Sequence, residues 1–292
     1  MINPRKYSVA ILGTGNIGTD LLMKVLRSRS LNCTLFSGRN LASPGMTTAS
    51  RLGVSVSVNG LAGILEAKDK VELVFDATSA EDHVKHSSLL AARNITCVDL
   101  TPAKIGHMCI PAVNLDECLG HSNVNMITCG GQAAIPIACA ITKANPSVEY
   151  IETVSSIASR SAGPATRINI DEYLATTENG LTTFTGCERT KAILILNPAQ
   201  PCVHMQTTVM AKIGVPNIER TRKEVDAMVT KIQNYVPGYQ LLLEPTIENG
   251  RLVCMIRVDG QGDYLPRYAG NLDIINCAAI AFAEAVAKRR LA

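Results

Sequence analysis

The sequence contains no tryptophan, and aromatic residues make up only 4% of its 292 residues. Its formal net charge is only +3, which is too weak and too dispersed to indicate binding to nucleic acid or to an anionic membrane. No run of about 18 consecutive apolar residues is present, so we expect no membrane span. These absences leave a soluble globular protein, for which a 47% hydrophobic composition supplies ample core material.

The ten cysteines form no Cys-x-x-Cys pair and no Cys/His cluster at metal-binding spacing. In a chain of this length, that pattern predicts reduced thiols, a cytoplasmic location and no bound metal. The N-terminal apolar run is too short for a secretory signal. It belongs instead to a motif described below.

Strand-like and helix-like runs alternate in the first half of the chain, which predicts a parallel sheet covered by helices on both faces. The expected strands cover residues 7–12, 32–37, 71–77, 96–100 and 123–128. The second half is richer in longer strands, expected at 148–159, 192–197, 202–213, 240–248 and 251–259. A helix fits between Glu219 and Tyr235, and an amphipathic helix ends the chain. We therefore expect an α/β domain over 1–130, a mixed sheet-rich domain over 131–269, and a helix over 270–292 that packs back on the first domain.

The segment Gly13-Thr14-Gly15-Asn16-Ile17-Gly18 matches G-x-G-x-x-G and lies between an apolar strand and a helix. In this context the first glycine permits a tight turn, the second lets the backbone approach a pyrophosphate, and the third lets helix and strand pack closely. The helix N-terminus offers N–H groups to the anion. The sequence therefore predicts a Rossmann-type dinucleotide site at these six residues.

An NAD site usually places Asp or Glu about 20 residues further on, where the acid binds the ribose 2′-hydroxyl. Here that position reads Phe36-Ser37-Gly38-Arg39-Asn40, without an acid. An arginine at this point can bind a 2′-phosphate through charge-assisted hydrogen bonds. We therefore expect NAD or NADP as cofactor, with NADP favoured, and the alternative is that Arg39 is a solvated surface residue.

Cys129 lies between the strand-like run 123–128 and a helical run that begins near Gly131. A thiol at a helix N-terminus meets positive partial charge, so we expect its pKa to fall somewhat below the ordinary value of about 8.5. Most cysteines in a reduced protein are small core side chains. At a strand-to-helix step, Cys129 is instead predicted to add to an aldehyde, pass hydride to the nicotinamide and keep the acyl group as a thioester.

Six stretches spread over nearly the whole chain have a familiar pattern: ILGTGNIGTDLL, VFDATSA, DLTPAKIG, NVNMITCGGQA, SAGPATRINIDE and YLPRYAGNLDI. In these stretches the chain resembles the acylating acetaldehyde dehydrogenases, the partners of 4-hydroxy-2-oxovalerate aldolases. The resemblance implies a Rossmann domain and a glyceraldehyde-phosphate-dehydrogenase-like α+β catalytic and dimerisation domain, in a homodimer. It also implies coenzyme A as co-substrate, a small aldehyde or acyl thioester as substrate, and Cys129 as the acyl carrier.

The resemblance further implies cofactor contacts from two stretches that the residues alone leave open. The segment 161–169 could be a structured loop, and Asn271 could be a helix N-cap. The implied cofactor residues are Thr14, Gly15, Asn16, Ile17, Ser161, Ala162, Gly163, Pro164, Ala165, Thr166, Arg167, Ile168, Asn169 and Asn271.

Three features depart from the family pattern. The acid after the second strand is missing, and Thr207 occupies the position where the family has an aspartate that serves as a general base. Threonine cannot act as a base at neutral pH, and strand alternation points His204 away from residue 207. The hairpin around Glu248 and Gly250 is shorter than the family's, which puts docking to an aldolase in doubt.

Three functions remain open at this point. The first is an acylating aldehyde dehydrogenase that makes acyl-CoA from a short-chain aldehyde. The second is an NADPH-dependent semialdehyde-type reductase of an acyl phosphate or a carrier-bound thioester. The third is a non-catalytic dinucleotide-binding partner subunit, against which an intact Cys129 argues.

Overall fold

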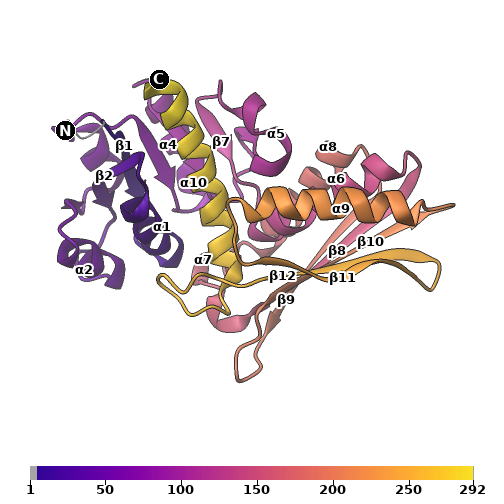
Figure 1. Cartoon of the computed structure of the whole chain (residues 1–292). Coiled ribbons are helices and arrows are strands. Elements are labelled where there is room, and N and C mark those ends of the chain that lie inside the picture. Colours follow the sequence, from indigo (N-terminus) through magenta and orange to yellow (C-terminus); the bar gives the residue numbers. More distant parts are fainter. Residues whose placement is uncertain (1–4, 292) are drawn as a thin grey trace. The chain divides into compact units, whose positions relative to one another are not determined.

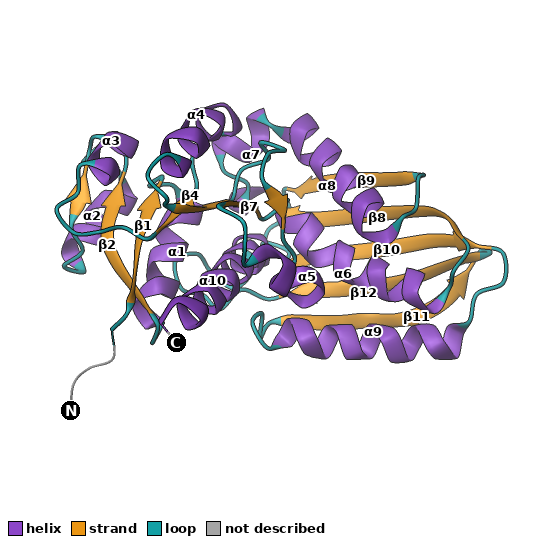
Figure 2. Cartoon of the chain, turned by 90° about the horizontal axis from the view of Figure 1, so that it is seen from above, coloured by secondary structure: helices purple, strands orange, loops and turns teal. Residues whose placement is uncertain are grey.

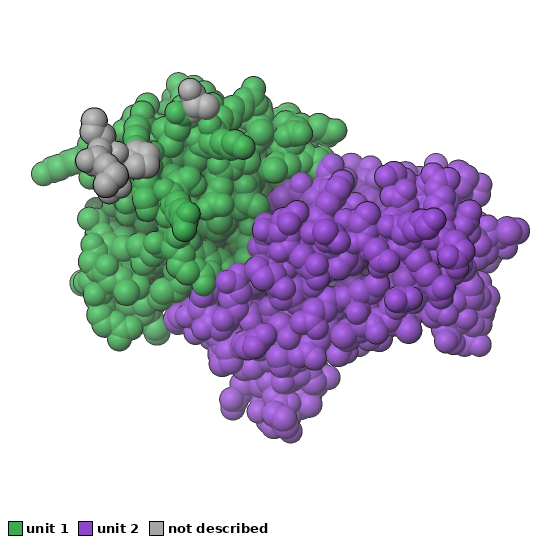
Figure 3. Space-filling model, in the orientation of Figure 1, with its two compact units in different colours: residues 1–109, 114–126, 276–292 green, residues 110–113, 127–275 purple. Residues whose placement is uncertain are grey.

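A computed structural model describes residues 5–291, without the side chains of Pro164 and Ala165. The chain forms two compact units, coloured separately in Figure 3. Unit 1 comprises Met1–Cys109, Asn114–Met126 and Asn276–Ala292, and unit 2 comprises Ile110–Val113 and Ile127–Ile275. The main border, between Met126 and Ile127, lies a few residues before the expected border at residue 130.

Unit 1 is built on a parallel sheet whose strand order is β3-β2-β1-β4-β5-β7-β6. This is the doubly wound order of dinucleotide-binding folds, in which the strand order reverses beside β1. The central strands are buried on both faces, which explains why they appear in the sequence as continuous apolar runs. The strands are β1 (Tyr7–Leu12), β2 (Leu31–Ser37), β3 (Val56–Ser57), β4 (Leu73–Asp76), β5 (Thr96–Asp99), β6 (His107–Met108) and β7 (Asn123–Asn125).

Helices lie on both faces of this sheet, with α3 and α4 on one side and α1 on the other (Figure 2). Ser43 caps α2 and Ser79 caps α4, each by accepting a hydrogen bond from a backbone N–H of the first turn. The helices are α1 (Asn16–Arg27), α2 (Pro44–Arg51), α3 (Gly60–Leu65), α4 (Ala80–Ala91) and α5 (Pro111–Cys118), the last of which is shared by the two units.

Unit 2 contains a five-stranded mixed sheet in the order β11-β12-β10-β8-β9, with only the β8–β9 pair parallel. Helices α6, α8 and α9 pack on one face of the sheet, as Figure 1 shows. The strands are β8 (Val148–Ala158), β9 (Thr190–Asn197), β10 (Met205–Ile213), β11 (Tyr239–Glu248) and β12 (Arg251–Val258), and the helices are α6 (Cys129–Ala144), α7 (Pro164–Ile168), α8 (Ile170–Thr185) and α9 (Ile218–Gln233). A 3-10 helix covers Ser159–Ser161.

The last helix, α10 (Gly270–Leu291), has its first six residues in unit 2 and the remainder in unit 1. The expectation of an amphipathic helix is wrong, because residues from Gly270 to Ala279 are buried without interruption. Among the described helices it is the one long and apolar enough to cross a membrane. However, 78% of its apolar window is buried inside the protein, as in the core helix of a globular domain.

Candidate active site

The glycine-rich loop connects β1 to α1, and its three glycines differ in their surroundings. Gly13 has a φ of 110°, and a Cβ there would lie 2.5 Å from the carbonyl oxygen of Ala77. A Cβ on Gly18 would lie 1.9 Å from the carbonyl oxygen of Gly13. Gly15 has no atom within 4 Å of its Cβ position and is the N-cap of α1, without a side-chain cap. This loop can therefore accept a pyrophosphate on the backbone at Gly15.

The end of β2 lies against the same loop. A Cβ on Gly38 would lie 2.5 Å from Cγ2 of Thr14, whose hydroxyl accepts a hydrogen bond from Ser43 at 3.1 Å. Arg39 follows directly, with a side chain that is 86% exposed and 4.0 Å from the Asp82 carboxylate. Arg39 therefore lies at the edge where parallel β1 and β2 both end, with its guanidinium accessible to a ligand.

Cys129 is the first residue of α6 and is half-buried. Thr128 caps the helix by accepting a hydrogen bond from the Gly131 N–H at 2.8 Å. The Cys129 Sγ lies 3.4 Å from the Tyr173 hydroxyl of α8, and the Gly130 N–H donates to that hydroxyl at 2.8 Å. The thiol therefore lies at the N-terminus of a helix beside a tyrosine hydroxyl.

The expectation that the pKa of Cys129 falls below its ordinary value is wrong. Burial raises the pKa of the thiol, and it outweighs the lowering effect of hydrogen bonds from Tyr173 and from the N–H groups of Gly130 and Cys129. The helix N-terminus and the tyrosine therefore reduce a desolvation penalty and do not produce a thiolate at neutral pH by themselves.

Thr207 is fully buried on β10, and its hydroxyl lies 2.9 Å from that of Ser155 on β8. The Ser155 hydroxyl in turn lies 3.0 Å from where a Cβ of Gly130 would be. Residue 207 thus faces the side of the sheet that carries Cys129, with hydroxyls and no carboxylate. His204 does not supply the general base that position 207 lacks. Its Nδ1 lies 2.7 Å from the carboxylate of Asp259, which also accepts a hydrogen bond from Arg257 at 2.6 Å.

The implied cofactor segment of unit 2 folds as the 3-10 helix, α7 and the start of α8. Ser161 and Ala162 are buried, whereas Ile168 is 80% exposed. Arg167 donates to the carbonyl and hydroxyl oxygens of Ser159, both at 2.8 Å. The backbone of this segment therefore has a defined conformation, although the side chains of Pro164 and Ala165 lie outside the described part. Asn169 is the N-cap residue of α8.

Asn271 meets this segment within unit 2. It lies in the first turn of α10, so the interpretation of Asn271 as the N-cap is wrong. Its Nδ2 donates to the Ser161 carbonyl at 3.4 Å, and its buried Oδ1 has no hydrogen-bond partner among the described residues. A buried acceptor without a partner fits a ligand donor such as a carboxamide N–H.

Comparisons with known proteins identify the family. A curated acetaldehyde dehydrogenase from Pectobacterium atrosepticum is 56% identical over 288 residues, covering 98% of this chain and 97% of that protein. An acetaldehyde dehydrogenase from Spirochaeta aurantia is 56% identical over 284 residues, covering 97% and 96%. The chain belongs to the acetaldehyde dehydrogenase family. In addition, the family described as "Prokaryotic acetaldehyde dehydrogenase, dimerisation" matches residues 129–266, a segment that begins at Cys129.

Solved structures of more distant proteins share the fold. An aspartate semialdehyde dehydrogenase II from Vibrio cholerae superposes with a TM-score of 0.66 at 14% identity, covering 98% of this chain and 99% of that one. An aspartate semialdehyde dehydrogenase with NADP from Candida albicans gives 0.68 at 9% identity, covering 99% and 100%. The expected Rossmann domain with a glyceraldehyde-phosphate-dehydrogenase-like second domain is therefore confirmed.

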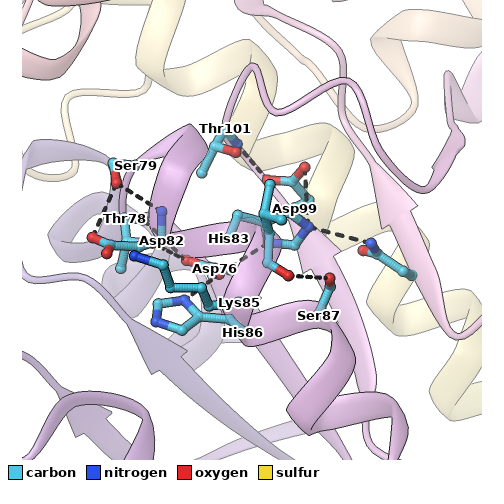
Figure 4. A network of polar contacts seen from close by, with 12 residues as sticks. Asp76, Thr78, Ser79, Asp82, His83, Lys85, His86, Ser87, Asp99 and Thr101 are labelled. Atoms are coloured by element: carbon cyan, nitrogen blue, oxygen red, sulfur yellow. Dashed lines mark hydrogen bonds and ion pairs between the residues drawn. The ribbon is translucent and has the colours of Figure 1, made fainter.

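Unit 1 of this family member also holds a buried ionic cluster that the sequence did not reveal (Figure 4). Asp76 ends β4 and Asp99 ends β5, and His83 of α4 lies between them, with Nδ1 2.9 Å from Asp76 and Nε2 3.3 Å from Asp99. The side chains of all three are fully buried. His86 adds a second imidazole, 2.8 Å from Asp76. The sequence signal for this cluster is an acid at the end of each of two buried strands. The carboxyl ends of adjacent parallel strands meet at one edge of the sheet, so two such acids lie close together.

Burial and ion pairing oppose each other in this cluster. Burial disfavours the charged form of His83, but Asp76 and Asp99 outweigh it and raise the pKa of the imidazole. Burial also acts on Asp76, where hydrogen bonds from His83, His86 and Thr78 prevail and lower the pKa well below its ordinary value. Burial raises the pKa of Asp99 to about 6, against the charge of His83 and hydrogen bonds from Thr101 and Asn125. The cluster is thus most favourable with an imidazolium at position 83.

Proposed function

We propose that this family member is an acylating acetaldehyde dehydrogenase that converts a short-chain aldehyde, coenzyme A and NAD(P)+ into acyl-CoA and NAD(P)H. The observation that carries the proposal is Cys129 at the start of α6, held by the Thr128 cap and in contact with the Tyr173 hydroxyl. Among the described cysteines of unit 2, Cys129 is the one that begins a helix.

In the proposed reaction, the Cys129 sulfur attacks the aldehyde carbon and forms a C–S bond as the carbonyl oxygen gains the electron pair. A bound nicotinamide would supply the hydride acceptor, so that the adduct carbon loses its hydride as the C=O bond re-forms. Cys129 then carries the acyl group as a thioester, and the coenzyme A thiol displaces it, so that the product leaves and the Cys129 thiol is restored. The Gly130 and Gly131 N–H groups already donate to Tyr173 and Thr128, so the start of α6 favours negative charge near the sulfur through its helix dipole.

The residues of both units fit a dinucleotide. In unit 1 the open backbone at Gly15 would hold the pyrophosphate, and Arg39 would hold a 2′-phosphate, which supports NADP over NAD. In unit 2 the segment Ser161 to Asn169 and the Asn271 Oδ1 would bind polar groups of the cofactor. Coenzyme A is proposed as the acyl acceptor on the strength of the family resemblance.

Thr207 supports a preference for the reductive direction. Both directions use the Cys129 thiolate, but only aldehyde oxidation releases a proton overall, and the buried hydroxyls of Thr207 and Ser155 cannot accept it at neutral pH. Reduction of an acyl thioester needs a proton delivered to the developing alkoxide, and no carboxylate at position 207 opposes that charge. We therefore infer comparatively slow aldehyde oxidation at pH 7, with a rate that rises as the pH approaches the pKa of Cys129.

A homodimer is proposed through the face of the unit 2 sheet that carries no described helix. Alternate residues of each strand point to opposite faces of the sheet. On β10, Thr207 and Val209 point to the face that the helices cover, and Thr208 points to the other face. The other face carries a lateral row formed by Met255, Thr208, Val154 and Ile193, which lie side by side on β12, β10, β8 and β9. Ile193 is 38% exposed and its neighbour on the same face, Ile195, is 45% exposed. Apolar rows of this kind favour burial by a second copy.

The remaining hypotheses are less well supported. The likeness to aspartate semialdehyde dehydrogenases, at 14% and 9% identity, concerns the fold alone and does not favour the semialdehyde-type reductase. An ordered Cys129 site disfavours a non-catalytic partner subunit. The β11–β12 hairpin turns tightly at Asn249 and Gly250, and this short turn disfavours docking to an aldolase.

The cytoplasm is proposed as the location of the protein. All ten cysteines lie in the described part and none forms a disulfide, which supports a reducing compartment.

The experiment that tests the proposal is trapping of the acyl-enzyme. The protein is mixed with acetyl-CoA without nicotinamide, and with acetaldehyde and NADP+ without coenzyme A. Peptide mass spectrometry should then find an acetyl group on Cys129. Cys129→Ala should carry none and should lose nearly all turnover while keeping dinucleotide binding, and retention of more than a few per cent of activity would refute the assignment.

A further inference from the structure

We propose that the Tyr173 hydroxyl is a catalytic group that donates a hydrogen bond to the Cys129 sulfur and stabilises its thiolate. The inference rests on the proposed role of Cys129 and assigns a second residue to the reacting atom. Tyr173 lies 44 positions away in sequence, in α8, and is 8% exposed. Its oxygen lies 3.4 Å from the sulfur, within reach of a hydrogen bond to sulfur.

The direction of this hydrogen bond follows from the other contacts of the hydroxyl. The Gly130 N–H donates to the Tyr173 oxygen at 2.8 Å, and the Thr128 side chain also hydrogen-bonds to it and lowers the pKa of the phenol, as a donor does. Donation to the oxygen from both groups leaves the O–H proton to point at Cys129. A thiol could act as donor or acceptor, but a thiolate can only accept. The pair therefore gains a charge-assisted hydrogen bond when Cys129 ionises. Donation from Gly130 also polarises the hydroxyl and makes it a stronger donor.

Tyr173 keeps its proton while it does this. Burial raises the pKa of the phenol well above its ordinary value, and the neighbouring Cys129 raises it further. The phenol is therefore a donor at every pH at which the enzyme would work, and it exchanges no proton with the substrate. No charged side chain is among the groups that shift the pKa of Cys129 within residues 5–291, so the phenol is the side chain best placed to offset burial.

The surrounding residues hold the phenol in place. The Thr177 hydroxyl, one turn further along α8, donates to the Tyr173 carbonyl and lies 2.7 Å from the Thr128 hydroxyl, the cap of α6. A side chain at Gly130 would come within 2.3 Å of the Tyr173 hydroxyl, so this position must be glycine if the phenol is to reach the backbone N–H. Two helices are thus connected at the point where the nucleophile lies.

The test is the pH profile of Cys129 alkylation by iodoacetamide, followed by mass spectrometry of the Cys129 peptide. A hydrogen bond to a charged group contributes about 1.5–3 kcal/mol, or roughly ten- to a hundredfold in the thiolate population. Tyr173→Phe should therefore slow alkylation at pH 7 about tenfold or more and move the profile to higher pH. The value of kcat/KM should fall at pH 7 and recover at high pH.

Tyr239→Phe is the matched control. Its buried hydroxyl also binds α6, donating to the Ala133 carbonyl at 2.7 Å, but it does not contact the sulfur. Its alkylation profile should match the wild type. An unchanged profile in folded Tyr173→Phe, or activity reduced equally at all pH values, would overturn the proposal. If that variant does not fold, 3-fluorotyrosine at position 173 should strengthen the donor and accelerate alkylation at pH 7, and an unaltered rate would count against it. Because alkylation needs no substrate, failure of the acyl-enzyme test would be distinguishable from failure here.

Discussion

Arg39 is the residue that decides between the two nicotinamide cofactors in the proposed function. Its guanidinium is exposed at the end of β2, and its ion pair with the Asp82 carboxylate is long, at 4.0 Å. A hydrogen-bonded phosphate contact contributes about 1.5–3 kcal/mol, so Arg39→Ala should lower kcat/KM for NADP roughly ten- to a hundredfold and leave that for NAD nearly unchanged. Steady-state kinetics with both cofactors checks this. Equal use of the two by the wild type would contradict it.

Thr207 is the second residue with a specific expectation. Thr207→Asp places a carboxylate beside the Ser155 hydroxyl, on the side of the sheet that faces Cys129. A general base typically contributes about 10²–10⁴-fold, so aldehyde oxidation at pH 7 should rise at least tenfold and its pH dependence should flatten. Rates of oxidation and thioester reduction between pH 6 and 9 provide the measurement, with Val215→Asp in the exposed loop after β10 as the control. No gain would show that another group takes the proton.

At the residue scale, the sequence predicts what is local. The glycines at 13, 15 and 18 and the thiol at 129 can be identified because a turn and its neighbouring helix are contiguous in sequence. Tyr173 cannot be found in this way, because only the packing of α8 on α6 brings it to the sulfur. The pKa of Cys129 was predicted in the wrong direction for the same reason, since burial is a property of the tertiary structure.

The ionic cluster that joins β4, β5 and α4 gives an expectation at the scale of elements. Because the folded state raises the pKa of His83, its contribution is fully present below the unfolded value of about 6.5 and is lost as pH rises through the folded value. The raised pKa of Asp99, about 6, has the same sign, but its contribution is lost between the unfolded value of about 3.9 and pH 6. Loss of the His83 contribution should therefore decrease the stability of unit 1 as pH rises from 6 to 8.

His83→Asn tests this expectation in urea unfolding at pH 6 and pH 8. Removal of one partner from a buried ion pair costs about 3–5 kcal/mol, and the variant should be destabilised most at pH 6, so that its pH dependence is weaker than that of the wild type. The exposed Lys85 of the same helix serves as control, since Lys85→Gln removes only an exposed ion pair with Glu81 and should preserve the wild-type dependence. Parallel curves for His83→Asn and the wild type would refute the charged state assigned to the cluster.

Among the elements, long strands with buried faces were predicted well and short or polar elements were not. The expected strand at 7–12 coincides with β1, because Tyr7–Leu12 is apolar at every position but Ser8. β3 and β6 contain only two residues each and are held by their neighbours, so they leave no periodic signal. α8 was not predicted, since its threonine-rich sequence has low helix propensity and its formation depends on packing against α6 and β9.

At the scale of the whole molecule, the proposed homodimer gives the clearest test. The wild type should sediment at twice the 31.2 kDa of the chain. Ile193→Glu puts a charge into the apolar row of the helix-free face, where burial would desolvate it, and should yield monomers at micromolar concentration. Val215→Glu is the control, because Val215 is 93% exposed in the loop after β10 and should not affect assembly. A dimer that persists in Ile193→Glu would place the interface elsewhere.

The path of α10 has a consequence for how the gene can be divided. The chain leaves unit 1 at Met126, builds nearly all of unit 2, and returns within a single helix at Asn276. In terms of gene structure, the second unit is an insertion into the first, so no contiguous reading frame encodes unit 1 alone. A stop codon after position 275 would remove Phe282, which is fully buried, together with most of a helix. Fragments meant to isolate the nucleotide-binding half should therefore be built by joining codon 126 to codon 276 through a linker.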